Sequence, residues 1–494
     1  MSVKARDKTS PELGQSRSTN TIGKVIASYP RFPSSFAERK LVLILGDMAS
    51  LALTVCASFL LWRSAQPAGS GGELSMTLDR YWLLVLPAGW CIVARLMDLY
   101  HLPFACDRRT VALQMALLGA AALAARLAGF SLIPDNPDRV LFFNTMLIGW
   151  LVILAWRGAY AAILSPSFPP HRILIVGTGT RAQYVTSLLE ESPNLNCVIA
   201  GHCRGSGPAP LPSGPSARTG NRPRDLADLA QRLQVHQIIV AVDGAIENAL
   251  FLQLAECQTN GIQVSLMPDF LEQIFQKIPI EHIEPNWAMQ VLQGRPAFNR
   301  FQLGLKRLLD LVLALLGLVV LLACLPFVAI AIRLDSAGPV LYRQTRCGRS
   351  GKPFSIVKFR TMIQDAERDG KPRWAAADDA RITSVGHLLR KTYLDELPQV
   401  VNVLRGEMSI VGPRPERPEF VQQLQREIPF YRTRLMVKPG LTGWAQTQYR
   451  YGNSADDALI KLQYDFYYLR NWSIWLDLRI ILQTFGAVLT SKGT

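Results

Sequence analysis

Three observations predict a chain built of three structurally different parts. Four long apolar runs come first, then a strand that ends in a glycine-rich turn, and finally a proline-broken apolar segment followed by basic β-like strands. We therefore expect a membrane α-helical bundle, an α/β Rossmann-like domain, and an α+β membrane-associated domain with a re-entrant helix hairpin. The expected boundaries are 1–40 for a flexible cytoplasmic arm, 41–165 for the four-helix bundle, 171–290 for the Rossmann-like domain and 300–494 for the α+β domain, whose re-entrant helix covers 306–334.

The composition indicates a chain that lies partly in lipid. Hydrophobic residues make up 49% of its 494 residues, a high share for a purely soluble protein. The net charge of +15 suits anionic lipid headgroups, phosphorylated substrates or nucleic acid equally well, so charge alone does not choose among them. The eight cysteines have no paired spacing and the six histidines form no cluster, which indicates neither a disulfide framework nor a zinc site.

Each of the four apolar runs is about as long as the ~20 residues that cross a bilayer as a helix. The runs are Leu41–Trp62, Tyr81–Tyr100, Val111–Ile133 and Val140–Leu164. Basic residues dominate the N-terminal arm, the loop at 95–109 and the exit at 157–172, so both ends of the bundle are expected to face the cytoplasm. Asp47, Arg95 and Arg126 lie in or near these runs, where helix pairing or snorkelling explains most charged residues.

The Rossmann-like part opens at His171–Ala182 with a strand followed by a G-x-G-x-x-A turn. Further strands are expected at 197–202, 237–242 and 262–267, with helices at 224–233 and before 262, around a Gly/Pro/Ser-rich loop at 205–223. A dinucleotide site would need an acidic residue at the end of the second strand, but that strand leads to Cys203 and Arg204. We therefore favour a Rossmann-like fold without its nucleotide, while a ligand is left open.

A run of 22 mostly apolar residues, Leu311–Ile332, determines on which side of the membrane the rest of the chain lies. Pro326 removes a helix hydrogen bond inside this run and predicts a kink. Lys306 and Arg307 precede the run and Arg333 follows it, so both ends carry the charge typical of the cytoplasmic side. A re-entrant hairpin with Pro326 at the point of re-entry satisfies both facts, and a fifth spanning helix with an ordinary kink is the alternative.

Basic residues then gather on two expected β-like strands, 340–348 and 354–362. They are Arg343, Arg346, Lys358 and Arg360. Cations held on strands suit anionic ligands, although a single basic residue is more often a solvated surface charge. Their significance depends on the carboxylates that follow.

Two adjacent carboxylates, Asp395 and Glu396, come next. Asp395 is expected to cap a helix running through Leu404, because Asp is a common N-cap and proline is tolerated in a first helical turn. Arg390, about one turn upstream, and Arg414, held between prolines, would surround the pair with phosphate-binding groups. A carboxylate that attacks phosphorus needs such charge neutralisation, normally with Mg²⁺, so the sequence indicates phosphate chemistry at a membrane surface. Further carboxylates are available at Asp465 and Asp477.

A set of motifs occurs in fixed order through the C-terminal part of the chain. They are Lys306–Asp310, the Pro326 segment, Lys358–Met362, Leu394–Gln399, Asn402–Ser409, Gly412–Glu416, Lys438–Trp444 and the stretch Asp465–Asp477. This set strongly resembles the bacterial polyprenyl-phosphate hexose-1-phosphate transferases. The apolar runs and the Rossmann-like part are similar to the long form of that family, which has four N-terminal membrane spans and primes exopolysaccharide, capsule or O-antigen synthesis.

The resemblance implies transfer of a hexose 1-phosphate from a UDP-sugar, with UDP-glucose as the best guess, to undecaprenyl phosphate. The implied partners are the UDP-sugar, undecaprenyl phosphate and the lipid bilayer, with no nucleic acid, and a homodimer is left open. The implied location is the cytoplasmic face of the bacterial inner membrane. In the implied reaction Asp395 attacks the β-phosphorus, UMP leaves, and the lipid phosphate then attacks the phosphosugar-aspartate of the catalytic domain.

The resemblance also implies residue roles. Asp395 and Glu396 would be catalytic; Arg390, Arg414, Lys358 and Arg360 would bind substrate phosphate; Glu396, Asp477 and Asp465 would hold Mg²⁺. Glu407 stands where the family often has Asp, a change we expect to be harmless. The segment 446–452 varies in the family and is a candidate for contact with the sugar, so the identity of the sugar and the polysaccharide pathway are left open.

Two other classes of protein are alternatives to this interpretation. A membrane-bound NAD-dependent epimerase or dehydratase would need a Tyr-x-x-x-Lys pair, and no tyrosine in this chain has lysine four residues on. A non-catalytic membrane scaffold or regulator of polysaccharide assembly stays as the alternative, in which the basic C-terminal part would only dock lipid headgroups.

Overall fold

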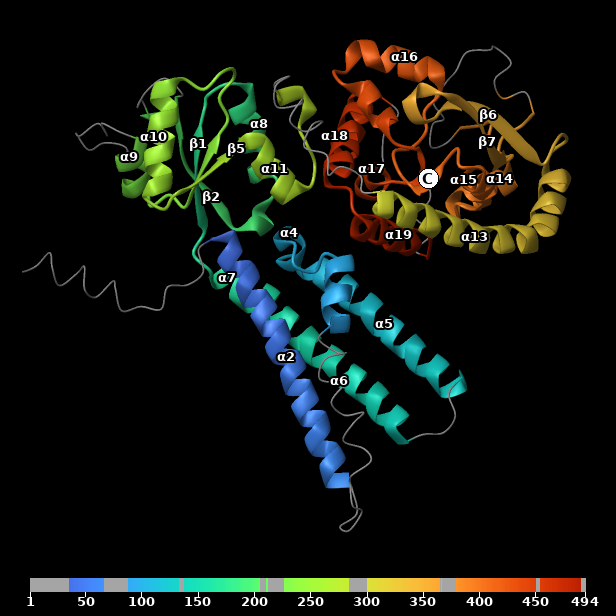
Figure 1. The fold of residues 1–494 in the computed structure, drawn as a ribbon, viewed down its shortest axis with the longest axis horizontal. Helices are drawn as coiled ribbons and strands as arrows, with labels where there is room; N and C mark the ends of the chain where they lie inside the picture. Colours follow the sequence, from blue (N-terminus) through green and yellow to red (C-terminus); the bar gives the residue numbers. More distant parts are fainter. Residues whose placement is uncertain are drawn as a thin grey trace, which may run out of the picture.

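A computed structural model describes most of the chain. The described residues are 35–65, 88–132, 137–204, 210–211, 226–283, 300–364, 366, 379–449 and 454–489. Figure 1 shows a group of long helices, a sheet covered by helices, and a larger domain of helices and short strands. Most of the expected arm, 1–34, lies outside the described residues, and the first described helix begins at Phe36 rather than at Leu41.

Three long helices form the described part of the bundle. They are α2 (Phe36–Ala65), α5 (Arg108–Leu132) and α6 (Pro137–Ala159), joined by the short α4 (Leu102–Ala105); a π-helical turn (Tyr160–Leu164) and α7 (Ser165–Ser167) extend α6. Of the second expected run, only the C-terminal half is described, and it is helical at 88–96. Phe36–Ser58 and Asn144–Ser167 are long and apolar enough to cross a membrane. The count of four spans stays a prediction.

A buried ion pair ties α2 to α6. Arg157 donates to the Asp47 carboxylate at 2.5 Å and to the Leu99 carbonyl at 2.9 Å, and the Trp90 indole donates to the same carboxylate at 3.1 Å. A charge buried in this way is stable only when it is paired and hydrogen-bonded. Pairing between α2 and α6 therefore explains why the charged residue Asp47 occurs inside an apolar run.

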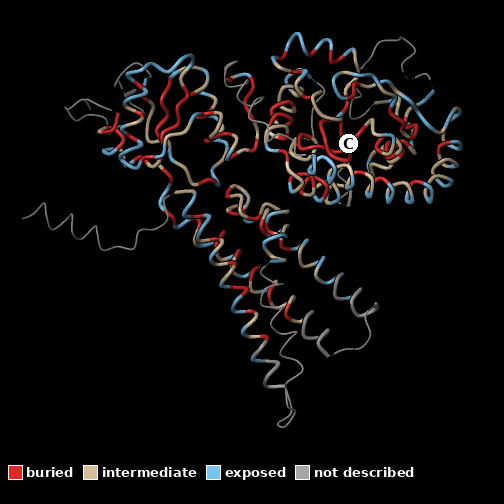
Figure 2. The backbone as a smooth tube through the Cα atoms, viewed as in Figure 1, coloured by how far each residue is buried: buried red, intermediate tan, exposed pale blue. Residues whose placement is uncertain are grey.

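The second part contains the predicted parallel sheet. Strands β1 (His171–Val176), β2 (Cys197–Cys203), β4 (Gln237–Val240) and β5 (Gln263–Leu266) are parallel, and β3 (Pro210–Leu211) adds an antiparallel edge in the order β3-β2-β1-β4-β5. Figure 1 shows α8 (Thr180–Glu190) and α11 (Met267–Phe275) on one face and α9 (Leu226–Arg232) and α10 (Asn248–Thr259) on the other. Ile173 and Ile175 pack toward α8 and α11, whereas Leu174 and Val176 pack toward α9 and α10, which makes the central strands the buried core in Figure 2.

The third part is built on one long helix and two small sheets. Its elements are α13 (Arg300–Asp335), β6 (Leu341–Cys347), β7 (Pro353–Phe359), α14 (Ser384–Lys391), α15 (Val400–Arg405), β8 (Ser409–Val411), α16 (Pro418–Glu427), β9 (Gly440–Thr442), α17 (Trp444–Gln448), α18 (Ala455–Asn471) and α19 (Ile474–Leu489). Strands β6 and β7 form an antiparallel hairpin, as the basic β-like segments predicted. The parallel pair β8 and β9 was not predicted, because each strand has only three residues.

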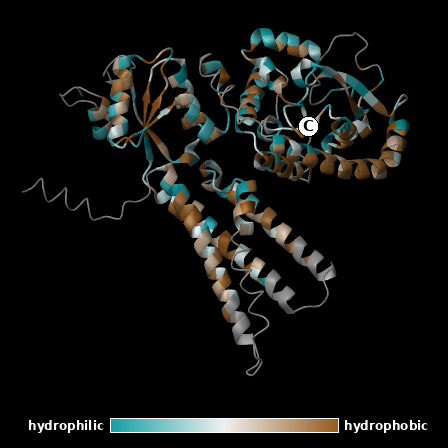
Figure 3. Ribbon diagram, viewed as in Figure 1, coloured by the Kyte–Doolittle hydropathy of each residue, from teal (hydrophilic) through white to brown (hydrophobic). Residues whose placement is uncertain are grey.

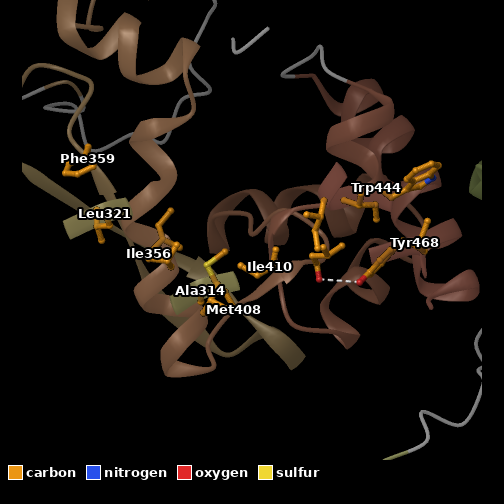
Figure 4. Close-up of a cluster of buried hydrophobic side chains, with 14 of the residues drawn as sticks. Ala314, Leu321, Ile356, Phe359, Met408, Ile410, Trp444 and Tyr468 are labelled. Carbon is orange, nitrogen blue, oxygen red and sulfur yellow. Dashed lines mark hydrogen bonds between the residues drawn. The ribbon is translucent and has the colours of Figure 1, made fainter. Parts of the chain in front are cut away.

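One side of α13 packs on the core of this domain. Ala314 and Leu321 lie with Ile356 of β7, Met408 and Tyr468 in the cluster of Figure 4, where the dashed line is the 3.3 Å hydrogen bond from the Tyr468 hydroxyl to the Val411 carbonyl. Many apolar residues of α13 are exposed, and the helix is largely brown, the colour of hydrophobic residues, in Figure 3. Its exposed residues include Leu308, Leu315, Leu316, Val319, Leu322, Phe327, Ile330 and Leu334.

Both ends of α13 are anchored to the same domain. Near its start, Lys306 donates to Asp477 at 2.7 Å. At its end, the Asp335 carboxylate accepts from the Val385 backbone at 2.9 Å. A straight helix would place these two anchors about 44 Å apart. Pro326 lies inside the helix, and Figure 1 shows α13 following the lower edge of the domain and bending near its end.

Candidate active site

The two adjacent carboxylates lie in a 3-10 turn, η5 (Leu394–Gln399), which leads into α15. The chain enters this turn through Tyr393, whose φ of 58° lies in the left-handed region that non-glycine residues rarely adopt. The expectation that Asp395 caps a helix through Leu404 is wrong. Tyr393 takes the N-cap position without a side-chain cap, because the turn begins one residue earlier than Asp395. The Asp395 carboxylate is therefore not used for capping.

Glu396 is held by two cations from different parts of the domain. Lys358 on β7 donates to Glu396 Oε1 at 2.6 Å, and Arg414, in the loop after β8, donates to both carboxylate oxygens at 2.7 and 3.4 Å. Burial alone would raise the pKa of Glu396, but these two cations outweigh it and hold the pKa well below its usual range. Glu396 is therefore ionised throughout the physiological range.

Asp395 has the opposite character although it is the next residue. It is 8% exposed, and among the described residues no side chain or backbone group donates a hydrogen bond to it. Burial, with the like charge of Glu396, raises the pKa of Asp395 to about 6, against the opposing charges of Lys358, Arg414 and Arg390. Adjacent carboxylates with such different pKa values are typical of sites where one is reactive and the other is a fixed charge.

The predicted arginines take different places. Arg390 on α14 donates to the Thr361 hydroxyl at 3.0 Å and lies close enough to Asp395 for their charges to interact. Arg360 instead donates to the Ser336 carbonyl and hydroxyl, at 2.7 and 3.0 Å, and so fastens the end of α13. The structure thus brings Asp395, Glu396, Lys358 and Arg414 together with Arg390 at the margin, and it gives Arg360 a structural partner.

The two other predicted metal ligands are engaged elsewhere. Asp465 on α18 pairs with Arg434 at 3.0 Å. Asp477 on α19 accepts from Lys306 at 2.7 Å, from the Tyr468 hydroxyl at 2.8 Å and from the Trp472 indole at 3.1 Å. In the part of the chain that the structure describes, no three His, Cys, Asp or Glu side chains gather closely enough to hold a metal ion. The expected set of Glu396, Asp465 and Asp477 is therefore not assembled.

Asp477→Asn should destabilise the protein rather than change its need for metal. The substitution leaves Lys306 partly buried without its counter-charge, a loss of about 3 to 5 kcal/mol for a buried pair. We expect a lower midpoint in thermal unfolding of the full chain, by the same amount with and without Mg²⁺. Asp456→Asn, at an exposed position on α18, is the matched control. A normal midpoint with a raised Mg²⁺ requirement would restore Asp477 as a ligand.

One further functional contact was missed from the sequence. Arg434, buried in a short 3-10 segment, donates to the Arg414 carbonyl at 3.1 Å and to the Tyr431 hydroxyl at 2.7 Å. It therefore supports the loop that carries Arg414. The sequence around Arg434 gives no indication of this role, because Arg434 lies 20 residues from Arg414 and resembles any other basic residue.

The glycine-rich turn of the Rossmann-like domain is occupied by the chain itself. The Asp243 carboxylate, after β4, accepts from the Thr180 backbone N–H at 3.0 Å, at the start of α8. A Cβ added to Gly179 would lie 1.5 Å from the same carboxylate oxygen. A helix N-terminus at this place holds the phosphate in dinucleotide-binding proteins, so Asp243 takes the position of that anion. The absence of a nucleotide from this domain stays a prediction.

Comparison with known proteins places the site inside a region that matches a protein-family model. Residues 301–491 match the model of a family described as bacterial sugar transferase. The chain is 40% identical over 240 residues to the UDP-N-acetylgalactosamine-undecaprenyl-phosphate N-acetylgalactosaminephosphotransferase of Aeromonas hydrophila, covering 49% of this chain and 55% of that protein. It is 38% identical over 295 residues to the UDP-glucose:undecaprenyl-phosphate glucose-1-phosphate transferase of Escherichia coli (strain K12), covering 58% and 61%.

A shorter relative is matched over most of its length. The chain is 44% identical over 192 residues to the UDP-glucose:undecaprenyl-phosphate glucose-1-phosphate transferase of Caulobacter vibrioides, covering 38% of this chain and 71% of that protein. The match thus spans less than two thirds of the first two relatives and more than two thirds of the third. The matched region of the shorter relative corresponds in length to the α+β domain.

Proposed function

The chain belongs to the bacterial sugar transferase family, and we therefore propose that it transfers a hexose 1-phosphate from a UDP-sugar to undecaprenyl phosphate. The products are undecaprenyl-diphosphate-sugar and UMP, and the reaction would prime the synthesis of a surface polysaccharide. The observation that carries the proposal is Asp395, a buried carboxylate without a hydrogen bond from the described residues, beside a Glu396 held by Lys358 and Arg414. The names of the relatives support glucose and N-acetylgalactosamine as donor sugars, and UDP-glucose is our first choice.

The reaction proceeds in two displacements at the β-phosphorus. An Asp395 oxygen forms a bond to this phosphorus, and the bond to the bridging oxygen breaks, so UMP leaves with the electron pair. An oxygen of the lipid phosphate then attacks the same phosphorus, and the bond to Asp395 breaks, which regenerates the carboxylate. The positive charges of Lys358, Arg414 and Arg390 offset the repulsion between the anionic nucleophile and the phosphates.

The residues present fit a Mg²⁺ ion shared with the substrate. Protein sites for Mg²⁺ commonly use one or two carboxylates and complete the octahedron with substrate phosphate oxygens and water. Glu396, with Asp395 beside it, would hold the ion, which supplies charge neutralisation at the phosphates when bound. Asp465 and Asp477 are left out of this set, because among the described residues they do not gather with Glu396 into a group that could hold a metal ion.

Direct contact between the parts before and after α13 supports a re-entrant helix. Ile278 and Ile280, near the C-terminal end of the Rossmann-like domain, lie in one cluster with Phe420 and Phe466 of the α+β domain. Two domains that touch lie on the same side of a membrane. We therefore propose that α13 dips into the cytoplasmic leaflet of the inner membrane and returns, which holds the site where a cytosolic UDP-sugar and a lipid phosphate can both reach it. A homodimer stays a prediction.

Cysteine labelling should show Lys352 and Glu256 on the same side of the membrane. Both are exposed, one on the hairpin after α13 and one on the Rossmann-like domain before it. Native Cys347 is unsuitable because it is buried. Each residue is changed to Cys in a chain with Cys56→Ala and Cys91→Ala, since these two native thiols are exposed. Labelling of Lys352→Cys and Glu256→Cys from opposite sides would make α13 a spanning helix.

The rate of the first displacement should fall below about pH 6. A carboxylate whose pKa is raised keeps its proton up to a higher pH, so the attacking ionised form of Asp395 is lost as the pH falls through about 6. We expect a plateau above pH 7 and a tenfold loss per pH unit well below 6. Single-turnover UMP release without the lipid acceptor is the measurement, because it excludes titration of the lipid phosphate. A plateau that continues below pH 5 would contradict this assignment.

A panel of radiolabelled UDP-sugars tests the function itself. Full-length protein in bilayers containing undecaprenyl phosphate is incubated with each donor, and label in the lipid extract is compared with UMP release. We expect both to rise together with one donor or a small group of donors. No transfer from any donor would favour the scaffold alternative.

A further inference from the structure

Gln276, at the C-terminal end of α11, contacts all three parts of the chain. Its side-chain amide donates to Asp98 Oδ2 of the bundle at 2.9 Å and accepts from Arg479 of α19 at 3.1 Å. Its backbone carbonyl accepts from the Trp444 indole at 3.0 Å. Gln276 has φ of 53°, where glycine or asparagine is usual at a helix end. The left-handed backbone conformation therefore favours glycine at position 276, but glycine could not make the two side-chain hydrogen bonds of Gln276.

Arg479 closes the junction with Asp98. Its guanidinium donates to Asp98 Oδ2 at 3.0 Å and lies 4.6 Å from the centre of the Trp444 ring. The Arg479 side chain is 7% exposed, so this pair is not an ordinary surface salt bridge. Asp98 lies in the turn before α4, also at a left-handed φ of 52°. Asp98, Gln276 and Arg479 thus form a closed triangle of polar contacts between residues far apart in the sequence.

The junction is connected to the active site on one side and to the membrane helix on the other. Trp444 follows β9, and the Thr442 carbonyl at the end of β9 accepts from Gly412, in the loop that carries Arg414, at 2.9 Å. Arg479 lies two residues after Asp477, which holds Lys306 at the start of α13. A displacement at the junction would therefore move both the Arg414 loop and the anchor of α13.

We propose that Arg479 is a positioning residue: the Asp98–Gln276–Arg479 junction sets the height and tilt of the α+β domain relative to the membrane bundle, so that Asp395 meets the lipid phosphate. This inference rests on the proposed function. Removing Arg479 leaves the Gln276–Asp98 hydrogen bond but breaks the contacts of α19 with both residues, which loosens the hold of the α+β domain on the bundle. Access of the bilayer-embedded substrate suffers, whereas access of the soluble UDP-sugar does not.

The kinetic test compares two lipid acceptors with the full-length protein. In nanodiscs, Arg479→Gln should raise the KM for undecaprenyl phosphate about tenfold, equivalent to ~1.4 kcal/mol, and leave the KM for the UDP-sugar and kcat within about twofold. With a short-chain prenyl phosphate in detergent, the variant should match the wild type, because a soluble acceptor needs no fixed height. The matched control is Arg470→Gln, which breaks the ion pairs of α18 with Asp269 and Glu272 of α11 and leaves Asp98, Gln276 and Arg479 unchanged.

Two further variants separate contacts from backbone strain. Gln276→Gly relieves the left-handed conformation but removes both side-chain hydrogen bonds, so we expect the same rise in KM for undecaprenyl phosphate. Asp98→Asn combined with Arg479→Gln should be no worse than Arg479→Gln alone, because both act on one junction. An equal fall of kcat with both acceptors would show that Arg479 has only a local structural role. An unchanged KM for undecaprenyl phosphate in nanodiscs would contradict the proposed positioning role of the junction.

Hydrogen exchange tests the junction without using activity. In Arg479→Gln we expect faster exchange in both 95–101 of the bundle and 441–446 of the α+β domain, compared with Arg470→Gln. Unchanged exchange at 95–101 would overturn the junction even if the transferase assay succeeds. If wild-type protein transfers no sugar but exchange rises in both segments, the proposed function fails while the coupling of the domains stands.

Discussion

Asp395→Asn should reduce UMP release from the UDP-sugar by about 10³-fold or more, the usual range when a covalent nucleophile is removed. The amide has the same shape but cannot form the bond to phosphorus. Among the described residues no group donates to the Asp395 carboxylate, so the substitution removes no hydrogen bond between them. Burial disfavours its charge, so we expect an unchanged or higher thermal midpoint. Loss of activity without loss of stability is the result that identifies a reactive group.

The control and the chemical readout are independent of each other. Asp456→Asn removes an exposed carboxylate of the same domain and should retain normal turnover. Wild-type protein incubated with a UDP-sugar but no lipid acceptor should carry an acid-labile hexose-phosphate adduct on Asp395 in mass spectrometry. Normal turnover of Asp395→Asn, or an adduct on another side chain, would remove Asp395 from the role of nucleophile.

Glu396→Gln should have the second strongest effect, a loss of about 10²-fold or more in kcat. A neutral amide cannot balance Lys358 and Arg414, which then repel each other across the site. The negative charge of Glu396 also raises the pKa of Asp395, so its removal should lower that pKa. We therefore expect the acid limb of the pH profile to move below 6 while the plateau falls. Single-turnover UMP release across pH measures both effects.

Glu396→Asp is the matched variant, because it keeps the charge and shortens the side chain by one methylene. It should recover part of the activity and keep the acid limb near its wild-type position. The Mg²⁺ concentration for half-maximal rate should rise in Glu396→Gln and less in Glu396→Asp. A kcat within about twofold of the wild type in Glu396→Gln, with the same Mg²⁺ requirement, would contradict the role of Glu396.

Local patterns were sufficient for most elements of secondary structure. The strand and glycine-rich turn of His171–Ala182 predicted β1 and the start of α8, and the two basic β-like segments became the β6–β7 hairpin. The apolar run around Pro326 became one long helix with an exposed apolar side. These features depend on hydrophobic periodicity and on glycine and proline, which act over a few residues. The three-residue strands β8 and β9 lack such a signal and were missed.

The sequence, with the family resemblance of its motifs, was enough to predict the groups for phosphate transfer: Asp395, Glu396, Lys358, Arg390 and Arg414. Their roles stay a prediction. Only the tertiary structure decided how the remaining charges are used. Asp477 binds Lys306 across 171 residues, Asp243 fills the anion position of the glycine-rich turn, and Asp98 meets Gln276 and Arg479. The physical reason is that the role of a buried charge depends on its partner. Partners brought together by folding leave no trace in the local sequence.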